Sequence, residues 1–188
     1  MKRYGLLLGW MLLALSACRN AHSEYITGVA LFVFDNATHQ DQTLASAMNP
    51  NVPGVFCLIA QSMKSGAVQL LFENNQGLES SVIANAKDLK RPIQLGYNNG
   101  IIVGFSNLDI PAEFYAYDKE CPNCFDPNAV PVRSKPLTMT SVGLARCGVC
   151  HREYNLNADG VVVKGDAGKK LTRYRAQTTG VFGQLAVH

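Results

Sequence analysis

Four cysteines arranged as two doublets constrain this chain more than any other feature of its sequence. The first doublet is Cys121 and Cys124, the second is Cys147 and Cys150, and 22 residues separate the two. Thiolates presented in this way by two loops can close a tetrahedron around one soft or borderline cation. The spacing within each doublet is common in zinc sites, although the gap between them is slightly longer than in most zinc ribbons. The doublets therefore predict a metal site and leave its metal open.

The residues inside the doublets favour a metal over disulfides. Pro122 fixes the backbone angle φ and Gly148 permits unusual φ values, which helps each loop fold back so that its amides face sulfur. Disulfides form in exported proteins, so two bridges among the four cysteines are the alternative. The same two-residue spacing in both doublets is more typical of a knuckle that presents sulfur to a metal.

The beginning of the chain is typical of an exported protein. Lys2 and Arg3 precede an apolar run over residues 6–14, which matches a secretory signal and is too short to span a bilayer. The following residues, Leu15-Ser16-Ala17-Cys18, resemble the lipobox of bacterial lipoproteins. This resemblance implies cleavage before Cys18 and attachment of lipid to it, which would anchor the protein stably in a lipid bilayer. A plain signal peptide cut near Ala17 is the alternative.

These features divide the chain into three parts. Residues 1–17 are the predicted lipoprotein signal peptide, residues 18–24 a lipidated tether, and residues 25–188 a single domain with metal-binding loops at about 118–155. A chain of 188 residues with 47% hydrophobic residues has enough apolar side chains for a proper core. The net charge of +3 indicates no nucleic-acid partner.

The apolar pattern predicts an all-β fold, a small sandwich or barrel made of many short strands. Asn98-Asn99-Gly100 lies between apolar runs at 93–97 and 101–105, a pattern that predicts a hairpin. Cys57 lies in an apolar run at 55–59 and is expected to be a buried, inert thiol. Four prolines, Pro122 in the first doublet and Pro127, Pro131 and Pro136 after it, mark the stretch leading to the second doublet as mostly loop, with little core beneath it. The acids Asp118, Glu120 and Asp126 in this region are expected to form a solvated rim.

The second doublet and the residues after it resemble the second half of a Rieske domain. The residues that carry this resemblance are Cys147, Cys150, Tyr154, Asn155, Leu156, Asp159, Gly160, Gly165, Leu171 and Tyr174. In the same register, residues 114–118 followed by Cys121 look like the strand that enters the first Rieske loop. The resemblance covers about residues 93–187 and implies a Rieske-like fold whose two-loop subdomain is similar to a zinc ribbon or rubredoxin knuckle. With the lipobox, the layout also looks like exported Rieske-like lipoproteins of Gram-negative bacteria.

The chain departs from the Rieske pattern at the metal ligands. A Rieske centre carries two histidines on one iron, whereas here Cys150 stands at the second histidine position and Cys124 near the first. His151 adjoins Cys150, but its offset from Tyr154 is wrong by one residue, so it is expected to be exposed rather than a ligand. The predicted ligands are therefore Cys121, Cys124, Cys147 and Cys150.

Two kinds of metal centre remain open. Zinc or a single iron would sit in a closed site and staple the loops of a non-catalytic binding module, which is the favoured interpretation. A [2Fe–2S] cluster would make the chain an electron-transfer protein with an unknown redox or envelope partner, at a lower potential than a histidine-ligated centre. The sequence has no Gly-x-Ser-x-Gly, His-Glu-x-x-His or phosphate-loop motif, so no enzyme activity is predicted. The expected location is the bacterial cell envelope, periplasmic or at the surface, with an outer-membrane anchor.

Overall fold

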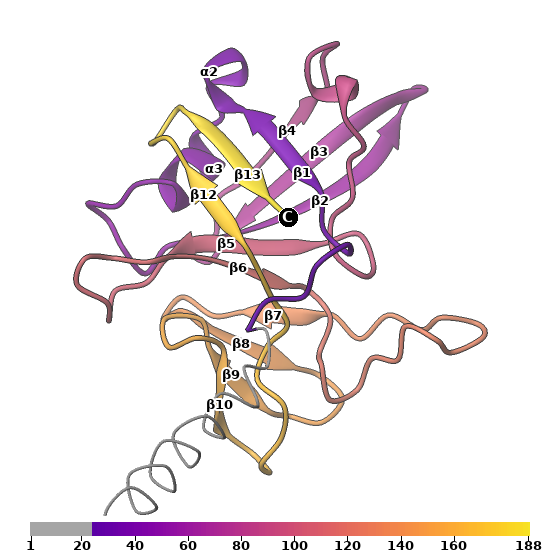
Figure 1. Ribbon diagram of the computed structural model, residues 1–188, viewed down its shortest axis with the longest axis vertical. Helices are drawn as coiled ribbons and strands as arrows, with labels where there is room; N and C mark the ends of the chain where they lie inside the picture. The colour runs from indigo at the N-terminus through magenta and orange to yellow at the C-terminus, as the bar shows by residue number, and fades with distance from the viewer. Residues whose placement is uncertain (1–23) are drawn as a thin grey trace, which may run out of the picture.

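The computed structural model describes residues 24–188, which form short antiparallel strands and only a few helical turns (Figure 1). In chain order the elements are β1 (Phe32–Asp35), α2 (Asn36–His39), α3 (Gln42–Ala47), β2 (Phe56–Lys64), β3 (Ala67–Asn74), β4 (Glu79–Ile83), the 3-10 helix η1 (Asp88–Lys90), β5 (Ile101–Phe105), β6 (Phe114–Asp118), β7 (Leu137–Met139), β8 (Leu144–Cys147), β9 (Glu153–Asn155), β10 (Val161–Lys164), β11 (Arg173–Tyr174), β12 (Ala176–Thr178) and β13 (Gln184–Val187). The prediction of a mostly-β chain is therefore confirmed.

The predicted signal peptide and Cys18 lie outside the described residues. Between residues 24 and 188, no helix has the length and apolar character needed to cross a membrane.

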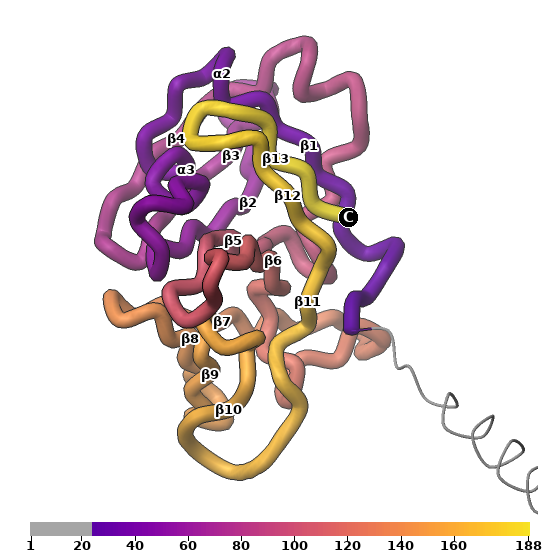
Figure 2. Tube along the Cα trace, turned by 60° about the vertical axis from the view of Figure 1, so that its left-hand side comes forward, coloured from indigo at the N-terminus to yellow at the C-terminus, as the bar shows by residue number. Residues whose placement is uncertain are grey.

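The strands form three sheets that pack as layers. The central sheet has six strands in the order β11-β6-β5-β2-β3-β4, the second has three in the order β1-β13-β12, and the third has four in the order β10-β9-β8-β7. Figures 1 and 2 both place the four-stranded sheet below β5 and β6, and the three-stranded sheet on the other side of these strands. The four-stranded sheet and its loops carry both cysteine doublets.

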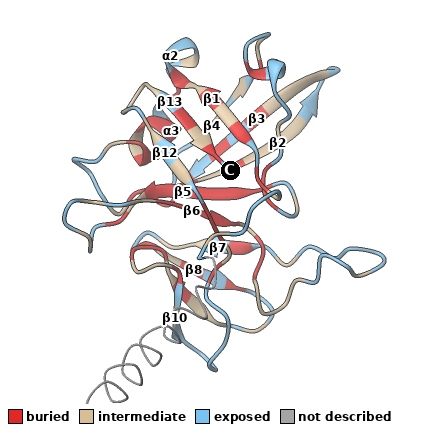
Figure 3. Cartoon of the chain, viewed as in Figure 1, coloured by how far each residue is buried: buried red, intermediate tan, exposed pale blue. Residues whose placement is uncertain are grey.

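Strands β5 and β6 separate two hydrophobic cores, and their side chains alternate between them. Ile101 and Val103 join the core against the three-stranded sheet, whereas Ile102 points to the opposite face and joins the core against the four-stranded sheet. On β6, Ala116 faces the first core and Tyr117 faces the second. Because successive side chains of a strand point to opposite faces, both faces of these strands are buried, as Figure 3 shows in red. This double burial explains why β5 is apolar at every position.

The first core is the larger and fills the space between the six-stranded and three-stranded sheets. Phe32 and Phe34 from β1 pack there with Phe72 of β3, and helix α3 adds the fully buried Leu44. Asp41 caps α3, since its carboxylate accepts a hydrogen bond of 2.8 Å from the Leu44 N–H. The short helix thus packs against β2 and β3.

The second core lies directly beneath the cysteine loops, so the expectation of little core under this stretch is wrong. Its buried members are Phe56, Ile102, Tyr115, Tyr117, Cys121, Leu137, Ala145, Cys147, Tyr154, Leu156 and Leu171. The prolines between the doublets led to the expectation of loop alone. However, Leu137 and Ala145 lie on β7 and β8 and supply apolar side chains to this core.

The predicted hairpin around Asn98-Asn99-Gly100 is also wrong. Strand β5 follows this turn, but it pairs with β2 and β6 on its two sides and leaves no edge for residues 93–97. Gln94 instead bridges to Leu31. The turn is held by tertiary contacts: the Asn99 side chain accepts from the Gln61 N–H at 3.0 Å and donates to its carbonyl at 2.8 Å. Asn98-Asn99-Gly100 does form a turn, but the strands that pair with β5 lie elsewhere in the chain.

The buried thiol of Cys57 provides a prediction that is simple to test. Its side chain is fully buried in the first core, and burial raises the pKa of the thiol well above its ordinary range. We expect a charged thiol reagent at pH 8 to leave Cys57 unmodified in the native protein and to modify it after denaturation, because the reactive thiolate is absent from the folded state. Peptide mass spectrometry before and after addition of denaturant measures this. If Cys57 in the native protein were labelled as fast as in the denatured protein, its thiol would not be buried as described.

Candidate metal centre

The two cysteine doublets form matching turns on either side of strand β7. Cys147 is the last residue of β8 and pairs with Leu137 on β7, while the Cys121 N–H donates to the carbonyl of Lys135, just before β7. In the first turn, the N–H of Cys124 bonds the Cys121 carbonyl at 3.1 Å. The Phe125 N–H also donates to this carbonyl at 2.9 Å, and the second turn has the equivalent bond of 3.1 Å, from the His151 N–H to the Cys147 carbonyl. Each doublet therefore begins on a strand-like segment and ends on a tight turn.

These turns bring the four predicted ligands together. The Sγ atoms of Cys121 and Cys150 are 3.8 Å apart, as are those of Cys124 and Cys147. All four sulfur atoms lie within 4.8 Å of one another. A tetrahedral ion with metal–sulfur bonds of about 2.3 Å has sulfur–sulfur edges of about 3.8 Å. The cluster therefore has the size of a four-thiolate site around one ion.

The same sulfur–sulfur distances are too long for disulfide bonds, so the four cysteines are separate thiols. A disulfide joins its sulfur atoms at about 2.0 Å, and none of the cysteines in residues 24–188 is bridged in this way. Both sulfur pairs at 3.8 Å join one doublet to the other, as expected when both loops contribute to one tetrahedron.

Each doublet has one buried and one partly exposed sulfur ligand. Cys121 and Cys147 are fully buried in the second core, whereas Cys124 and Cys150 are partly exposed at the end of their turns. Burial raises the pKa of the Cys121 and Cys124 thiols, and for Cys124 the neighbouring thiols raise it further. An apolar cluster of protonated thiols would resist ionisation, so a cation at the centre would supply the charge that keeps them as thiolates.

The pKa of Cys150 is lowered, unlike those of Cys121 and Cys124. Desolvation acts to raise it, but hydrogen bonds from the backbone and side chain of Arg152, together with those from the Cys124 and Cys147 thiols, outweigh that effect and lower the pKa to about 6. Arg152 is held in place by the carbonyls of Asp166 and Ala167, at 2.9 and 3.2 Å. At neutral pH the site thus offers at least one ready thiolate, which is the form that binds a metal.

The hydroxyl of Tyr154 makes a polar contact with the sulfur cluster. Its oxygen lies 3.2 Å from Cys121 Sγ and accepts a hydrogen bond of 2.9 Å from the Asn123 side chain. Either group can be the donor in this contact while Cys121 is a thiol, but a Cys121 thiolate has no proton, so towards it the hydroxyl is the donor. Asn123 is held in turn by the backbone of Lys169: its side chain donates to the Lys169 carbonyl and accepts from the Lys169 N–H. Partners of this kind orient the ligands of a metal site.

Removing this hydroxyl tests its role. We expect Tyr154→Phe to keep the metal content of the native protein and to lower the free energy of unfolding by about 1–2 kcal/mol, because the contact with Cys121 Sγ and the hydrogen bond from Asn123 are both lost. Tyr97→Phe is the matched control, since the Tyr97 ring is partly exposed and contacts Phe125. Chemical denaturation and metal analysis of both variants measure this. Equal unfolding curves for the two variants would contradict a supporting role for Tyr154.

Two acids near the first doublet are buried, which corrects the expectation of a solvated rim. Asp118 and Glu120 are 1% and 2% exposed, and only Asp126 lies at the surface. Glu120 accepts from the Asn98 side chain at 2.7 Å, the Ser134 hydroxyl at 2.6 Å and the backbone N–H of Lys135. These bonds tie the segment before β7 to the turn before β5. The sequence signal missed was the density of Asn, Ser and Tyr donors in neighbouring segments.

The histidine beside the second doublet does not join the site. His151 is exposed and has a positive φ of 58°, and it is not among the residues that gather at the cluster. The expectation that His151 is an exposed polar residue is therefore confirmed.

Comparison with known proteins gives no relative for this chain. No protein-family model, no curated protein and no solved structure matches it. The function must therefore be inferred from the site itself.

Proposed function

We propose that this chain is a lipid-anchored, Rieske-like module in which four cysteines hold one structural metal ion, either zinc or a single iron. The observation that carries this proposal is the spacing of the sulfur atoms, since all four lie within 4.8 Å of one another. A stable ion there would tie the first cysteine loop to the end of β8 and so hold the third layer together.

The spacing favours one metal ion over a binuclear cluster. In a [2Fe–2S] cluster two bridging sulfides separate the irons, and each iron carries its own pair of protein ligands. Ligand atoms on different irons are then farther apart than ligand atoms that share one ion. Here the sulfur atoms of Cys121 and Cys150, and those of Cys124 and Cys147, are 3.8 Å apart, and no pair is separated beyond 4.8 Å.

The ligand set supports a structural rather than a catalytic role. Four cysteines complete the coordination of a tetrahedral ion and leave no position for water or substrate. Cys121 and Cys147 are also fully buried, which closes the inner side of the site. The module would therefore act by binding a partner of the cell envelope, not by chemistry at the metal.

Sequence and topology support the Rieske-like part of the proposal. The doublets occupy two loops beside the antiparallel sheet β10-β9-β8-β7, in the order that the motif resemblance implies. The lipobox resemblance at Cys18 supports a lipid anchor in the envelope of a Gram-negative bacterium, with the outer membrane as the expected site.

The second candidate is an electron-transfer protein with a [2Fe–2S] cluster. The contact between the Tyr154 hydroxyl and Cys121 Sγ favours it, because hydrogen bonds to sulfur tune the potential of iron–sulfur centres. A single iron would be tuned by the same bond.

Metal analysis with an absorbance spectrum, on mature protein purified anaerobically, tests both candidates. One zinc, or one iron without acid-labile sulfide, supports the proposed site. Two irons with acid-labile sulfide would replace it by the electron carrier. Absence of metal with all four thiols oxidised to disulfides would overturn both. Intact-mass analysis of membrane fractions tests the anchor, because lipid on Cys18 adds the mass of its acyl chains.

A further inference from the structure

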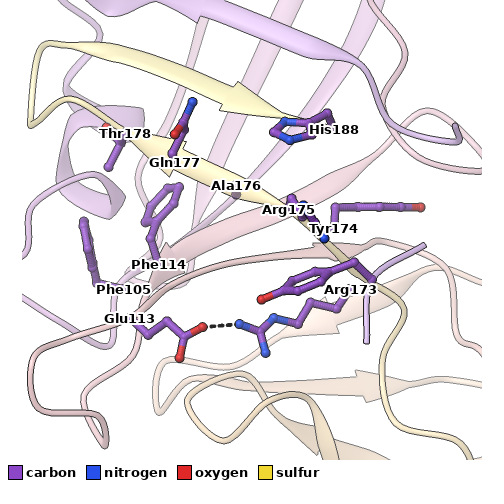
Figure 4. A pocket seen from close by; sticks show the side chains of 11 residues that line it. Phe105, Glu113, Phe114, Arg173, Tyr174, Arg175, Ala176, Gln177, Thr178 and His188 are labelled. Carbon is purple, nitrogen blue, oxygen red and sulfur yellow. Dashed lines mark hydrogen bonds and ion pairs between the residues drawn. The ribbon is translucent and has the colours of Figure 1, made fainter. Parts of the chain in front are cut away.

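A cavity opens where strand β12 separates from strand β6. The pairing of β11 with β6 ends at Tyr174 and Ala116, and the chain then continues into β12, which pairs with β13 instead. The space left between the diverging strands is about 620 Å³ (Figure 4), within the range of about 300–1,000 Å³ found for small-molecule sites. It lies apart from the cysteine cluster, none of whose residues lines it.

One wall of this cavity is aromatic. The rings of Phe105 and Phe114 lie 4.8 Å apart at a tilt of 55°, and both are only partly buried. Ala176 lines the cavity beside them and leaves room above the rings. This wall fits a flat apolar group, since aromatic pairs prefer tilted or offset contacts.

The other end of the cavity is built around Arg173, which is 5% exposed. Its Nη1 pairs with Glu24 and Asp159, each at 2.9 Å, and its Nη2 pairs with Glu113. The Tyr25 and Tyr115 rings lie 5.0 and 4.3 Å from the guanidinium carbon. Ion pairs and rings together hold the guanidinium in one orientation.

One N–H donor of the Arg173 guanidinium has no hydrogen-bond partner in the described part of the chain. This donor is Nε, which is buried. Nε and Nη2 share one edge of the planar group, the edge that a carboxylate can grip with both oxygens. Glu113 uses only half of this edge, because its Oε1 bonds Nη2 while Nε has no partner. The Tyr115 hydroxyl beside it donates to Asp109 at 2.9 Å and lies 3.4 Å from Oε2 of Glu113. The Glu113 side chain is also 49% exposed, so it can move aside.

A second cation lies beside Arg173. Arg175 is exposed, its guanidinium carbon lies 5.3 Å from the centre of the Tyr25 ring, and it makes no ion pair within residues 24–188. Figure 4 shows it between Arg173 and His188 at the edge of the cavity. Arg173 is already matched by three carboxylates, so Arg175 supplies the charge that attracts an anion.

We propose that this cavity binds a small aromatic carboxylate. The ligand carboxylate takes the Nε–Nη2 edge of Arg173 and displaces Glu113 into solvent, while Arg175 offsets its charge. The ring of the ligand packs on Phe105 and Phe114. Glu113 is thus an internal competitor that occupies the anion position in the absence of ligand.

Calorimetric titration of the mature protein with phenylacetate tests this inference, with the neutral phenylacetamide as the matched probe. We expect saturable binding of phenylacetate and at least tenfold weaker binding of the amide. Arg175→Gln should weaken phenylacetate binding up to about fivefold, the range of an exposed ion pair. Glu113→Gln should tighten it about tenfold, because the competing charge is removed. Arg133→Gln, on the exposed loop after the first doublet, should leave binding unchanged.

Three outcomes would overturn the inference. These are no saturable binding to either the native protein or Glu113→Gln, equal affinity for acid and amide, or weaker binding by Glu113→Gln. The metal content of each variant is measured alongside and is expected to stay at that of the native protein. If the native protein contained no metal but bound phenylacetate, the metal proposal would be wrong and the carboxylate-binding proposal would still hold.

Discussion

Replacing Cys121 by serine is expected to remove the metal and to unfold the layer formed by β7–β10. Cys121 is fully buried. Its sulfur lies 3.8 Å from that of Cys150 and 3.2 Å from the Tyr154 hydroxyl oxygen. Loss of one of four thiolates forfeits much of the binding free energy, which in structural zinc sites is also folding free energy and reaches about 10 kcal/mol or more. We expect the free energy of unfolding to fall by more than about 3 kcal/mol, measured by chemical denaturation together with metal analysis.

Two comparisons make this result specific to the metal. Cys57→Ala removes a buried thiol from the other core, so it should keep the metal and cost only about 1 kcal/mol or slightly more. Native protein stripped by a strong chelator should unfold like Cys121→Ser, and restored metal should rescue it but not the variant. Unchanged melting of both Cys121→Ser and the stripped protein would show that the cluster does not stabilise the fold through a metal.

The sequence was most informative where the chemistry is local. The two-residue spacing within each doublet requires a tight turn, and both turns close as that spacing predicts: the N–H groups of Phe125 and His151 donate to the carbonyl of the first cysteine of their doublets. The apolar run around Cys57 likewise predicted a buried strand, and β2 is one. In both cases, neighbouring residues carry the whole signal, so no distant contact had to be known.

The sequence was least informative where partners are distant. Asn99 and Gly100 are strong hairpin residues, yet β5 pairs with β2 and β6, and the pairing depends on a core that no local pattern encodes. The arrangement in three layers was missed for the same reason, because the alternation of Ile101 and Ile102 between two cores reads in the sequence as one apolar run. The Rieske resemblance and the anchor at Cys18 stay predictions.

The sequence also led to a wrong prediction for the exposure of the acids near the first doublet, and Asp118 shows why. An acid in a loop with other acids is usually solvated. Asp118 is instead 1% exposed and accepts from three donors. One is local, the Glu120 N–H at 2.6 Å, and two come from distant segments, the Tyr97 N–H at 2.8 Å and the Tyr174 hydroxyl at 2.6 Å. Only the folded chain brings these donors together.

We therefore expect Asp118→Ala to destabilise the protein by about 3 kcal/mol or more, because it leaves three buried donors without an acceptor. Asp166→Ala, at an exposed loop position, is the control and should change the unfolding free energy by less than about 0.5 kcal/mol. Burial raises the pKa of Asp118, although its hydrogen bonds act in the opposite direction. The folded state therefore binds the proton more tightly than the unfolded state, and the native protein should gain stability relative to Asp118→Ala as the pH falls through that raised pKa.

Denaturation of the native protein and both variants at pH 7 and at pH 4.5 measures these effects. The raised pKa predicts a larger stability gap between the native protein and Asp118→Ala at the lower pH. A gap that narrows on acidification would mean that the three donors outweigh burial and hold the pKa of Asp118 below its ordinary value. An Asp118→Ala variant as stable as Asp166→Ala at pH 7 would mean that these bonds do not join β6, β11 and the turn before β5. The first cysteine loop would then depend on its metal alone.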